Sequence, residues 1–589
     1  MMLRRPLHLF CLGLGLAAGL PGLAGSVPTA TGRVVELPPF IVTDSLPWQY
    51  AEVPGFEFLS LCSDSTTEQF VRQLYMMHQW LHAVLPPELQ VRLSVPVVNI
   101  LCDESMQKRL EKDIPADIRD LIAAGSPAVG STSAGIRFRQ VPSGRLQDDD
   151  TYTSFSMWGR SSLEYSRLWL TPNDVLFLLQ QRTPPLPAWF MRGFVELYGS
   201  MSFQPAGDPI VLNVPNPAHI EIRPMDWIPG AGTETPTAAE TRETAKTADE
   251  KNAGLPAPLL PMQELLLEPH PPAGAGPAAE RYRTIWIRQA TLFVRWGLDD
   301  DSGVLRRKFW KFVDLASRQT VTEALFQDCF GLNFARARSE LGRYSRIATH
   351  SPILIDLDGL SDPQITLRRA TNDDVARITG DWERLEAASV RQSYPPLAEK
   401  YLDHARRTLR RAYEHGDRDP RLLAVMGLCE CDAGNDAAAL PFLAAAAQAQ
   451  VVRPKAYFEL ARILGAAAIK RPDGPKGVLS AAQTAALLGP LAAGRMQFPP
   501  LRRACDLFAA VWVHSESLPS ASDLAQLDED TRLFPEDTAL TYGAALIDAR
   551  AGLFPVSRSL IERGLRGSPD ALTRTRFAHL QRLLPPTLK

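Results

Sequence analysis

Hydrophobic and polar positions alternate in two different ways along the first part of the chain. Short apolar runs such as GFEFLSLC, ending at Cys62, and VPVVNILC, ending at Cys102, are typical of buried strands. Between them, residues 66–85 place apolar side chains three and four positions apart, which predicts an amphipathic helix. Residues 135–140 and 151–157 alternate like strands of a sheet. This part of the chain therefore predicts an α/β arrangement.

Helical periodicity replaces this alternation further along. Two helix-like runs cover about 172–181 and 187–201, and the second opens on Pro187, a residue favoured in the first turn of a helix. Helical patterns rich in aromatic residues return over about 278–347. Between these parts, residues 229–258 are rich in Thr, Ala, Glu and Pro and contain almost no large apolar residue. Such a segment cannot bury enough surface to order itself, so we expect a flexible loop or linker.

From about residue 373 to the end, the chain is almost purely helical and shows internal repeats. Pro420 and Pro454 lie 34 residues apart, which is the period of the tetratricopeptide repeat. Small and large residues stand at the positions where two packed helices need them, namely Gly427, Gly434, Ala439, Leu443 and Ala446. A second copy has matching residues at Ala545, Gly552, Leu560 and Pro569, and residues 470–520 are less regular. We favour helical repeats over the alternative, a generic helical bundle with chance proline spacing.

The N-terminus has the pattern of an export signal. Arg4 and Arg5 precede an apolar run, and small residues follow at Ala24, Gly25 and Ser26. The alternative is a retained membrane anchor, but the run contains Gly and Pro and is short for a span of about 20 residues. We therefore expect a signal peptide over residues 1–25 and a periplasmic or secreted protein with no stable membrane span after cleavage.

Composition excludes one class of function. The chain has 589 residues, enough for three or four domains, with 45% hydrophobic and 22% charged residues. Its formal net charge of −3 provides no basic field for nucleic acid, and none of the usual nucleic-acid-binding modules is visible. We therefore expect no nucleic-acid partner.

The cysteines allow two interpretations. Cys11 lies in the signal, and the other six form no CxxC pair, so a cysteine-based zinc site is unsupported. Cys62 and Cys102 each end a strand-like run, and parallel neighbouring strands would bring both to the same end of a sheet. A disulfide between them is possible in an oxidising compartment. Two buried free thiols are the open alternative.

Two further groups consist of residue types that can bind metal ions, but each has a simpler interpretation than a metal site. His78 and His82 lie on one helix face, but Gln79 between them cannot act as a general base and no third ligand is placed by a motif. We expect surface or half-buried histidines. The acidic triplets 148–150 and 299–301 lack EF-hand spacing, so we expect solvated turns.

Residues 171–200, TPNDVLFLLQQRTPPLPAWFMRGFVELYGS, resemble the two active-site helices of the gluzincin zinc peptidases of the peptidase MA-like type. That family has H-E-x-x-H on one helix and P-x-W-x-x-E-G at the start of the next, where the Glu is the third zinc ligand. The second helix is matched at Pro187, Trp189, Gly193, Phe194 and Tyr198. Residues 278–345, which include EALFQDCFGLNFARARSEL, are similar to the family's C-terminal helical subdomain, so the resemblance covers roughly residues 50–345.

The zinc ligands of that family are not matched. By the family's spacing, Asn173 and Phe177 replace the two histidines, and Arg192 stands at the third-ligand position, where its charge repels a divalent cation. Asp174 alone keeps a carboxylate, at the position of the general base. Glu196, one turn after Arg192, is the alternative ligand in a shifted register, but both histidines would still be missing. The resemblance thus implies a pseudopeptidase without a cofactor, in which Arg192 pairs with Asp174.

The expected fold is α+β: a gluzincin-like α/β domain with a helical subdomain, followed by an all-α tetratricopeptide-like solenoid. The predicted parts are a signal peptide (1–25), the α/β domain (33–228), a linker (229–258), a helical subdomain (259–350) and the repeats (373–589). The expected function is non-catalytic binding of a protein or peptide on the helical-repeat surface. The alternatives are an extracytoplasmic hydrolase with an unrecognised active site and a purely structural envelope protein.

Overall fold

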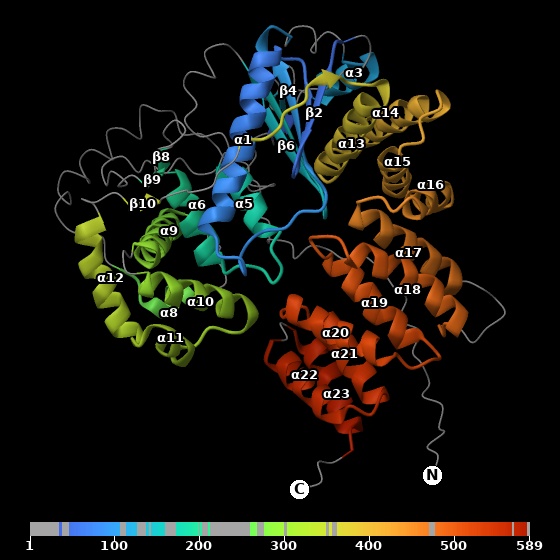
Figure 1. The fold of residues 1–589 in the computed structure, drawn as a ribbon. Coiled ribbons are helices and arrows are strands. Elements are labelled where there is room, and N and C mark those ends of the chain that lie inside the picture. Colours follow the sequence, from blue (N-terminus) through green and yellow to red (C-terminus); the bar gives the residue numbers. More distant parts are fainter. Residues whose placement is uncertain are drawn as a thin grey trace.

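A computed structural model describes residues 34–37, 46–106, 114–125, 137–140, 143–158, 172–199, 201–202, 210–212, 259–267, 276–299, 303–348, 353–355, 362–469, 477–567 and 570–585. The predicted signal peptide, the predicted linker and Pro569 lie outside the described residues. Figure 1 shows a sheet with helices on both faces, a lobe of helices α8–α12 on one side, and a helical array that runs from α13 to α23 on the other.

The main sheet has six strands among the described residues, in the order β11-β2-β3-β4-β7-β6. Strands β3, β4 and β7 run parallel, and the outer strands pair antiparallel. The bounds are β2 (Gln49–Val53), β3 (Phe56–Ser60), β4 (Val97–Asp103), β6 (Ser143–Gln147), β7 (Tyr152–Trp158) and β11 (Arg368–Arg369). The strands predicted near residues 55–62, 93–102 and 151–157 are therefore confirmed.

Two small sheets accompany the main one. Strand β1 (Val34–Leu37) pairs parallel with β5 (Arg137–Gln140), within the segment 135–140 that alternation predicts as a strand. Strands β8 (Met201–Ser202), β9 (Ile210–Leu212) and β10 (Ile353–Ile355) form an antiparallel sheet in the order β10-β9-β8.

Helix α1 (Asp64–Val84) covers one face of the main sheet. It begins at Ser63, whose hydroxyl accepts the backbone N–H of Thr66 and so satisfies one of the free donors of the first turn. The apolar side chains that predict this helix are all buried, at Phe70, Leu74, Met77, Leu81 and Leu85. Their spacing of three and four residues builds the continuous apolar stripe that the sheet requires. A short turn η1 (Glu104–Met106) and helix α3 (Ala116–Gly125) follow β4.

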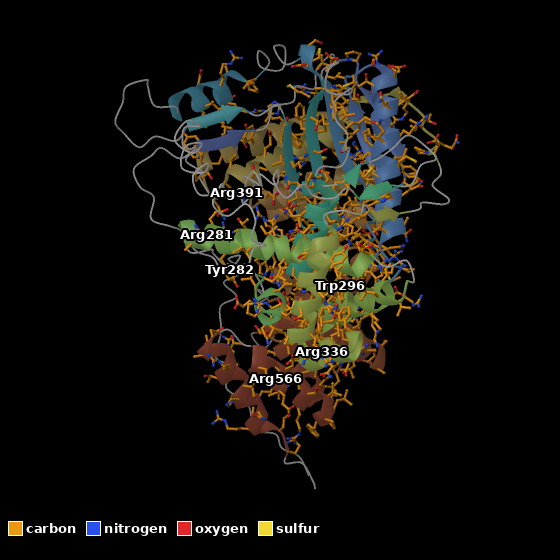
Figure 2. All side chains as sticks on the ribbon, turned by 90° about the vertical axis from the view of Figure 1, so that its left-hand side faces the viewer. Arg281, Tyr282, Trp296, Arg336, Arg391 and Arg566 are labelled. Carbon is orange, nitrogen blue, oxygen red and sulfur yellow. The ribbon has the colours of Figure 1, made fainter. Side chains whose placement is uncertain are left out.

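The helical lobe packs around a dense aromatic core. Its helices are α5 (Pro172–Gln180), α6 (Ala188–Gly199), α8 (Met262–Leu266), α9 (Pro277–Leu298), α10 (Val304–Arg318), α11 (Glu323–Phe330) and α12 (Phe334–Ala348). The Trp189 ring lies 5.1 Å from Phe293 and 5.9 Å from Phe312 between ring centroids. Figure 2 shows the outer side of the lobe, with Arg281 and Tyr282 on α9 and Arg336 on α12.

Gly193 sets the distance between helices α6 and α9, and this gives a first prediction. A Cβ atom on Gly193 would lie 2.5 Å from the backbone oxygen of Ala290, whereas one on Gly199 of the same helix would meet nothing within 4 Å. We expect Gly193→Ala to lower the free energy of unfolding by about 1–3 kcal/mol through overpacking. Gly199→Ala, the control, should change it by less than about 0.5 kcal/mol. Urea unfolding followed by tryptophan fluorescence measures both, and equal effects would refute this account of the α6–α9 contact.

Helix α13 (Asn372–Val390) covers the second face of the sheet and is also the first helix of the array. Ile378 and Trp382 from α13 share a core with Ile100 of β4 and Phe155 of β7. The predicted start of the repeats at residue 373 thus coincides with a helix that belongs to both parts. Because they share this core, the sheet and the start of the array form one packed unit.

The array continues through ten further helices within the described residues. These are α14 (Pro395–Glu414), α15 (Pro420–Asp432), α16 (Asp436–Gln448), α17 (Pro454–Ile469), α18 (Ala481–Arg495), α19 (Arg502–His514), α20 (Ala521–Leu533), α21 (Thr538–Arg550), α22 (Phe554–Gly567) and α23 (Ala571–Leu583). Pro420 and Pro454, the residues that define the 34-residue period, begin α15 and α17. The prediction of tetratricopeptide-like paired helices is confirmed at this level.

The small residues of the repeat let two helices approach closely or end a helix, as the pattern predicts. A Cβ atom on Gly427 of α15 would lie 2.5 Å from the Leu443 side chain of α16, so only glycine allows this approach. Gly434 and Gly552 end helices with φ values of +75° and +80°, in the left-handed region that favours glycine. Two helices of the array contain an internal proline, Pro441 in α16 and Pro490 in α18. Among the described residues, no helix is both long and apolar enough to cross a membrane.

Candidate functional site

The positions that correspond to the peptidase site lie on α5 and α6, and Asp174 has a different partner from the one expected. Its Oδ1 accepts from Arg145 Nε at 2.9 Å and from the Tyr152 hydroxyl at 2.5 Å. Arg145, rather than Arg192, therefore pairs with Asp174. The reason is topological: strands β6 and β7 bring Arg145 and Tyr152 to the first turn of α5. Phe177 stacks on Tyr152 with a centroid distance of 4.1 Å.

Arg192 and Glu196 lie one turn apart on α6 and influence each other. Burial lowers the pKa of Arg192, and Glu196 partly opposes that shift. Burial raises the pKa of Glu196, and Arg192 again opposes the shift. Together with the half-buried Asn173, this set supplies no histidine or thiolate, so it does not fit a catalytic zinc ion, which requires three protein ligands. Within the described residues, no three His, Cys, Asp or Glu side chains gather closely enough to hold a metal ion.

His78 and His82 are half-buried, as expected from the sequence. Their rings lie 4.6 Å apart, and His78 packs edge-on against Phe56 at 5.1 Å. Burial, with a smaller contribution from His82, lowers the pKa of His78 to about 4. The pair is therefore part of the packing between α1 and the β2–β3 hairpin.

Cys62 and Cys102 are free, buried thiols, which corresponds to the second of the two interpretations. The register of β3 and β4 places Ser60 opposite Leu101, so Cys102 lies beside Leu61 rather than Cys62. Successive side chains of a strand point to opposite faces of the sheet. Cys62 accordingly belongs to the core under α1, and Cys102 to the core under α13.

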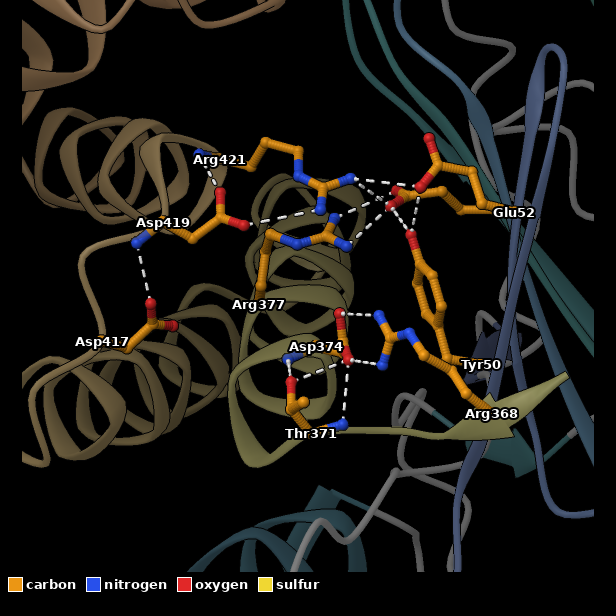
Figure 3. A network of polar contacts seen from close by, with 10 residues as sticks. Tyr50, Glu52, Arg368, Thr371, Asp374, Arg377, Asp417, Asp419 and Arg421 are labelled. Carbon is orange, nitrogen blue, oxygen red and sulfur yellow. Dashed lines mark hydrogen bonds and ion pairs between the residues drawn. The ribbon is translucent and has the colours of Figure 1, made fainter. Parts of the chain in front are cut away.

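The junction between sheet and array contains a buried carboxylate with several donors, shown in Figure 3. Glu57 on β3 accepts from Arg377 of α13 at 2.7 and 3.0 Å, and from Arg421 of α15 at 2.7 Å. The Tyr50 hydroxyl donates to the same carboxylate at 2.6 Å. Burial raises the pKa of Glu57, but Arg377 and Arg421 outweigh it and hold the pKa below its ordinary value. One anion thus joins a strand to two helices.

A second cluster joins the β6–β7 turn to the array and corrects the expectation for the triplet 148–150. Asp148 accepts from Arg384 Nη1 at 2.8 Å and from Lys455 Nζ at 2.6 Å. Asp150 accepts from the backbone N–H of Lys455 at 2.7 Å and faces Arg453 Nε at 3.2 Å. This is not a solvated turn, because the array covers it and supplies its counter-charges. In the other triplet, Asp299 accepts from the Tyr344 hydroxyl at 2.6 Å, and residues 300–301 lie outside the described residues.

A shallow pocket, partly open to solvent, lies between these two clusters; we call it the junction pocket. Its polar ends contain Glu57, Arg377 and Arg421 on one side, and Asp381, Arg453 and Thr151 on the other. Its walls are apolar, formed by Val95, Pro96, Val98, Ile378, Ala424, Val425, Val451 and Val452. Thr151 is only 2% exposed, and its hydroxyl has no hydrogen-bond partner. A buried hydroxyl without a partner is costly, so Thr151 is a polar group that the packing at this pocket leaves unsatisfied.

Exposed apolar side chains lie beside this pocket. Val452, Met496 and Phe498, which we call the apolar rim, are 46%, 80% and 43% exposed. Gln497 Nε2 donates to the Val451 carbonyl at 2.9 Å, which holds the rim together. The Phe498 backbone exchanges hydrogen bonds with Ser94 at 2.8 and 2.7 Å, next to the pocket residues Val95 and Pro96.

A second pocket lies within the array, and Pro454, Arg495 and Pro500 of its lining are close to the rim residues in sequence. It is lined by residues of α17, α18, α19 and α20, including Tyr457, Leu491 and Phe508. Residues that line the two pockets thus flank the rim residues along the chain. No single sequence motif marked this region, because its residues come from three strands of the sheet and their flanking segments, and from helices α13, α15, α17, α18, α19 and α20 of the array with their connecting segments.

Comparison with known proteins gives a limited result. No family model matches the chain, and no curated protein matches it. Among solved structures, YrrB, described as a TPR protein with an unusual peptide-binding site, is 14% identical and covers 34% of this chain and 91% of its own, with a TM-score of 0.26. A thermophilic TPR protein of Thermus thermophilus, TTC0263, is 15% identical and covers 35% of this chain and 100% of its own, with a TM-score of 0.23. The description of the array rests on its own helix lengths and contacts.

Proposed function

We propose that this chain is an exported, non-catalytic protein that binds a protein or peptide partner at the apolar rim and its two pockets. The observation that carries the proposal is the rim itself. Its three apolar side chains are exposed, and hydrogen bonds of Gln497 to Val451 and of Phe498 to Ser94 hold their segments next to a pocket with apolar walls. Apolar surface of this kind next to concave pockets is typical of binding sites.

The lining of the junction pocket indicates the chemistry of the bound side chain. Its carboxylates and guanidinium groups already pair with one another, so an incoming charge would meet no free counter-charge. The apolar walls favour an aliphatic or aromatic side chain. We therefore expect a peptide with a large apolar residue, bound with little dependence on salt.

A selection experiment tests this. Full-length protein is screened on a random peptide array, and the best peptide is titrated against wild type, Met496→Asp and the control Leu572→Asp, which changes a 64% exposed leucine on α23. Because a buried apolar side chain contributes roughly 1.5–3 kcal/mol, Met496→Asp should weaken binding by at least about 10-fold. Leu572→Asp should bind like wild type. Unchanged peptide binding by Met496→Asp would contradict the proposal.

The peptidase-like part is proposed to be a pseudopeptidase. The supporting observation is that Arg145 and Tyr152 engage the one carboxylate, Asp174, that stands at the family's general-base position. The alternative function, a hydrolase with a metal site, predicts metal in the protein. Elemental analysis of purified protein should find less than about 0.1 zinc per chain, and tightly held stoichiometric zinc would favour the hydrolase.

A further inference from the structure

The helical lobe carries an excess of positive charge that the peptide site does not use. Residues 303–348 contain nine Lys and Arg against four Asp and Glu, a formal charge of +5, whereas the whole chain has −3. Helix α10 carries much of this excess within six residues, at Arg306, Arg307, Lys308 and Lys311, all of them exposed.

The charges on α10 form one stripe. Its members are spaced by three, four and seven residues, which is close to whole helical turns, so they share one helix face. They are Val304, Arg307, Lys308, Lys311 and Arg318. The opposite face is buried through Phe309, Phe312 and Val313, which fixes the direction in which the stripe points. From Arg307 to Lys311 the cations span only one helical turn, about 6 Å of the axis.

Among the described residues, Arg318 is the only cation of the stripe with an acidic partner. The single acidic residue of α10, Asp314, pairs with Arg182 at 3.0 Å and with Arg318 at 3.0 Å. In the part of the chain that the structure describes, Arg307, Lys308 and Lys311 form no ion pair. Three mobile cations are thus left for an external anion.

The shape of the surface indicates the kind of partner. The two pockets described above are lined by the sheet and the array rather than by α10. An exposed row of cations on one helix face fits a flat, laterally uniform anionic surface, which needs no exact register. Val304 on the same stripe is 48% exposed and adds a small apolar contact. Exposed Lys and Arg side chains of this kind are attracted to the negative surface of anionic lipids.

We propose that the α10 stripe docks this protein on membranes that contain anionic lipids. Binding is peripheral and electrostatic, with Arg307, Lys308 and Lys311 facing the headgroups and the apolar face of α10 still packed in the lobe. The proposal is independent of the peptide site, since it uses other residues on another lobe.

Vesicle sedimentation tests the proposal. Full-length protein is mixed with two kinds of vesicle, one of phosphatidylcholine alone and one that also contains about 30% phosphatidylglycerol. On such an anionic surface, each nearby Lys or Arg strengthens binding about fivefold. We expect sedimentation only with the anionic vesicles, and its loss in about 0.5 M salt. The fraction bound to neutral vesicles measures any contribution of the apolar N-terminal run.

The matched variants are two triple charge reversals with the same net charge. R307E/K308E/K311E should lower the partition coefficient roughly 100-fold, whereas R574E/R576E/R582E on exposed positions of α23 should keep most of the binding. Equal binding by both variants, or no sedimentation of wild type with anionic vesicles at low salt, would overturn the proposal. Retention of wild type on immobilised polyglutamate without vesicle binding would also overturn it, in favour of an acidic protein partner. Melting temperatures within about 2 °C of wild type show that both variants remain folded.

Discussion

Glu57→Gln is expected to destabilise the protein by about 3–5 kcal/mol. The substitution keeps the shape of the side chain but removes a carboxylate that is 3% exposed and accepts from Arg377, Arg421 and Tyr50. Arg377 would then be a buried cation without its counter-charge, which is why the cost is high. Urea unfolding at pH 7, followed by tryptophan fluorescence, measures the change.

Glu52→Gln on the same hairpin is the matched control. The Glu52 side chain is 52% exposed, lies 3.8 Å from Arg421 and also accepts from the Tyr50 hydroxyl at 2.8 Å. Its ion pair is screened by water, and glutamine can still accept from Tyr50, so the substitution should cost less than about 1 kcal/mol. Similar effects of the two substitutions would mean that Glu57 does not hold the sheet to the array.

The protonation of Glu57 should make this contribution depend on pH. Burial raises its pKa, but the two guanidinium groups lower it further, so the net shift is downward. A carboxyl group with a lowered folded pKa stabilises the protein above its unfolded pKa of about 4.3 and loses that contribution as the pH falls. The difference between wild type and Glu57→Gln should therefore shrink in acid.

Arg384→Met should cost a similar amount, about 3–5 kcal/mol. Arg384 is 1% exposed and donates to Asp381 at 2.8 Å, Asp148 at 2.8 Å and Asp432 at 2.9 Å. Methionine fills a similar volume but leaves the three carboxylates without this cation. Lys455 and Arg453 remain nearby and keep the cost from being larger.

Arg391→Met, at the exposed end of the same helix, separates the buried charge from a general effect of losing an arginine. Its guanidinium donates to the Asp432 carbonyl at 3.0 Å from an exposed position. We expect a loss of less than about 1 kcal/mol in the same urea titration. A loss of under about 1 kcal/mol for Arg384→Met would contradict the role assigned to the second charge cluster.

The local elements could be predicted from the sequence because their signals are local. Phe70, Leu74 and Met77 reveal α1 through spacing alone, since one face of a helix must be apolar to cover a sheet. Pro420 and Pro454 reveal the repeat through a fixed period, and Gly427 reveals the close approach of two helices.

The junction could not be predicted, because its contacts join distant parts of the chain. Glu57 and Arg377 are 320 residues apart, and Asp148 and Lys455 are 307 apart, so no spacing rule relates them. The same limit explains the partner of Asp174: Arg145 reaches it only because β6 lies next to β7. One signal was present, in the charged run DWERLE of α13, whose positions are all buried. A helix that buries charged residues on several faces must be surrounded by counter-charges from other elements.

The central claim is that a peptide binds at the apolar rim, and the position of the bound peptide tests it most directly. A photoreactive benzoylphenylalanine is placed at residue 496 or, as a control, at residue 572, both strongly exposed leucine-sized positions. After irradiation with the selected peptide, mass spectrometry measures the crosslinked fraction. We expect crosslinking from position 496 and only background from position 572. Equal crosslinking from both positions, or none from position 496 at saturating peptide, would contradict the claim.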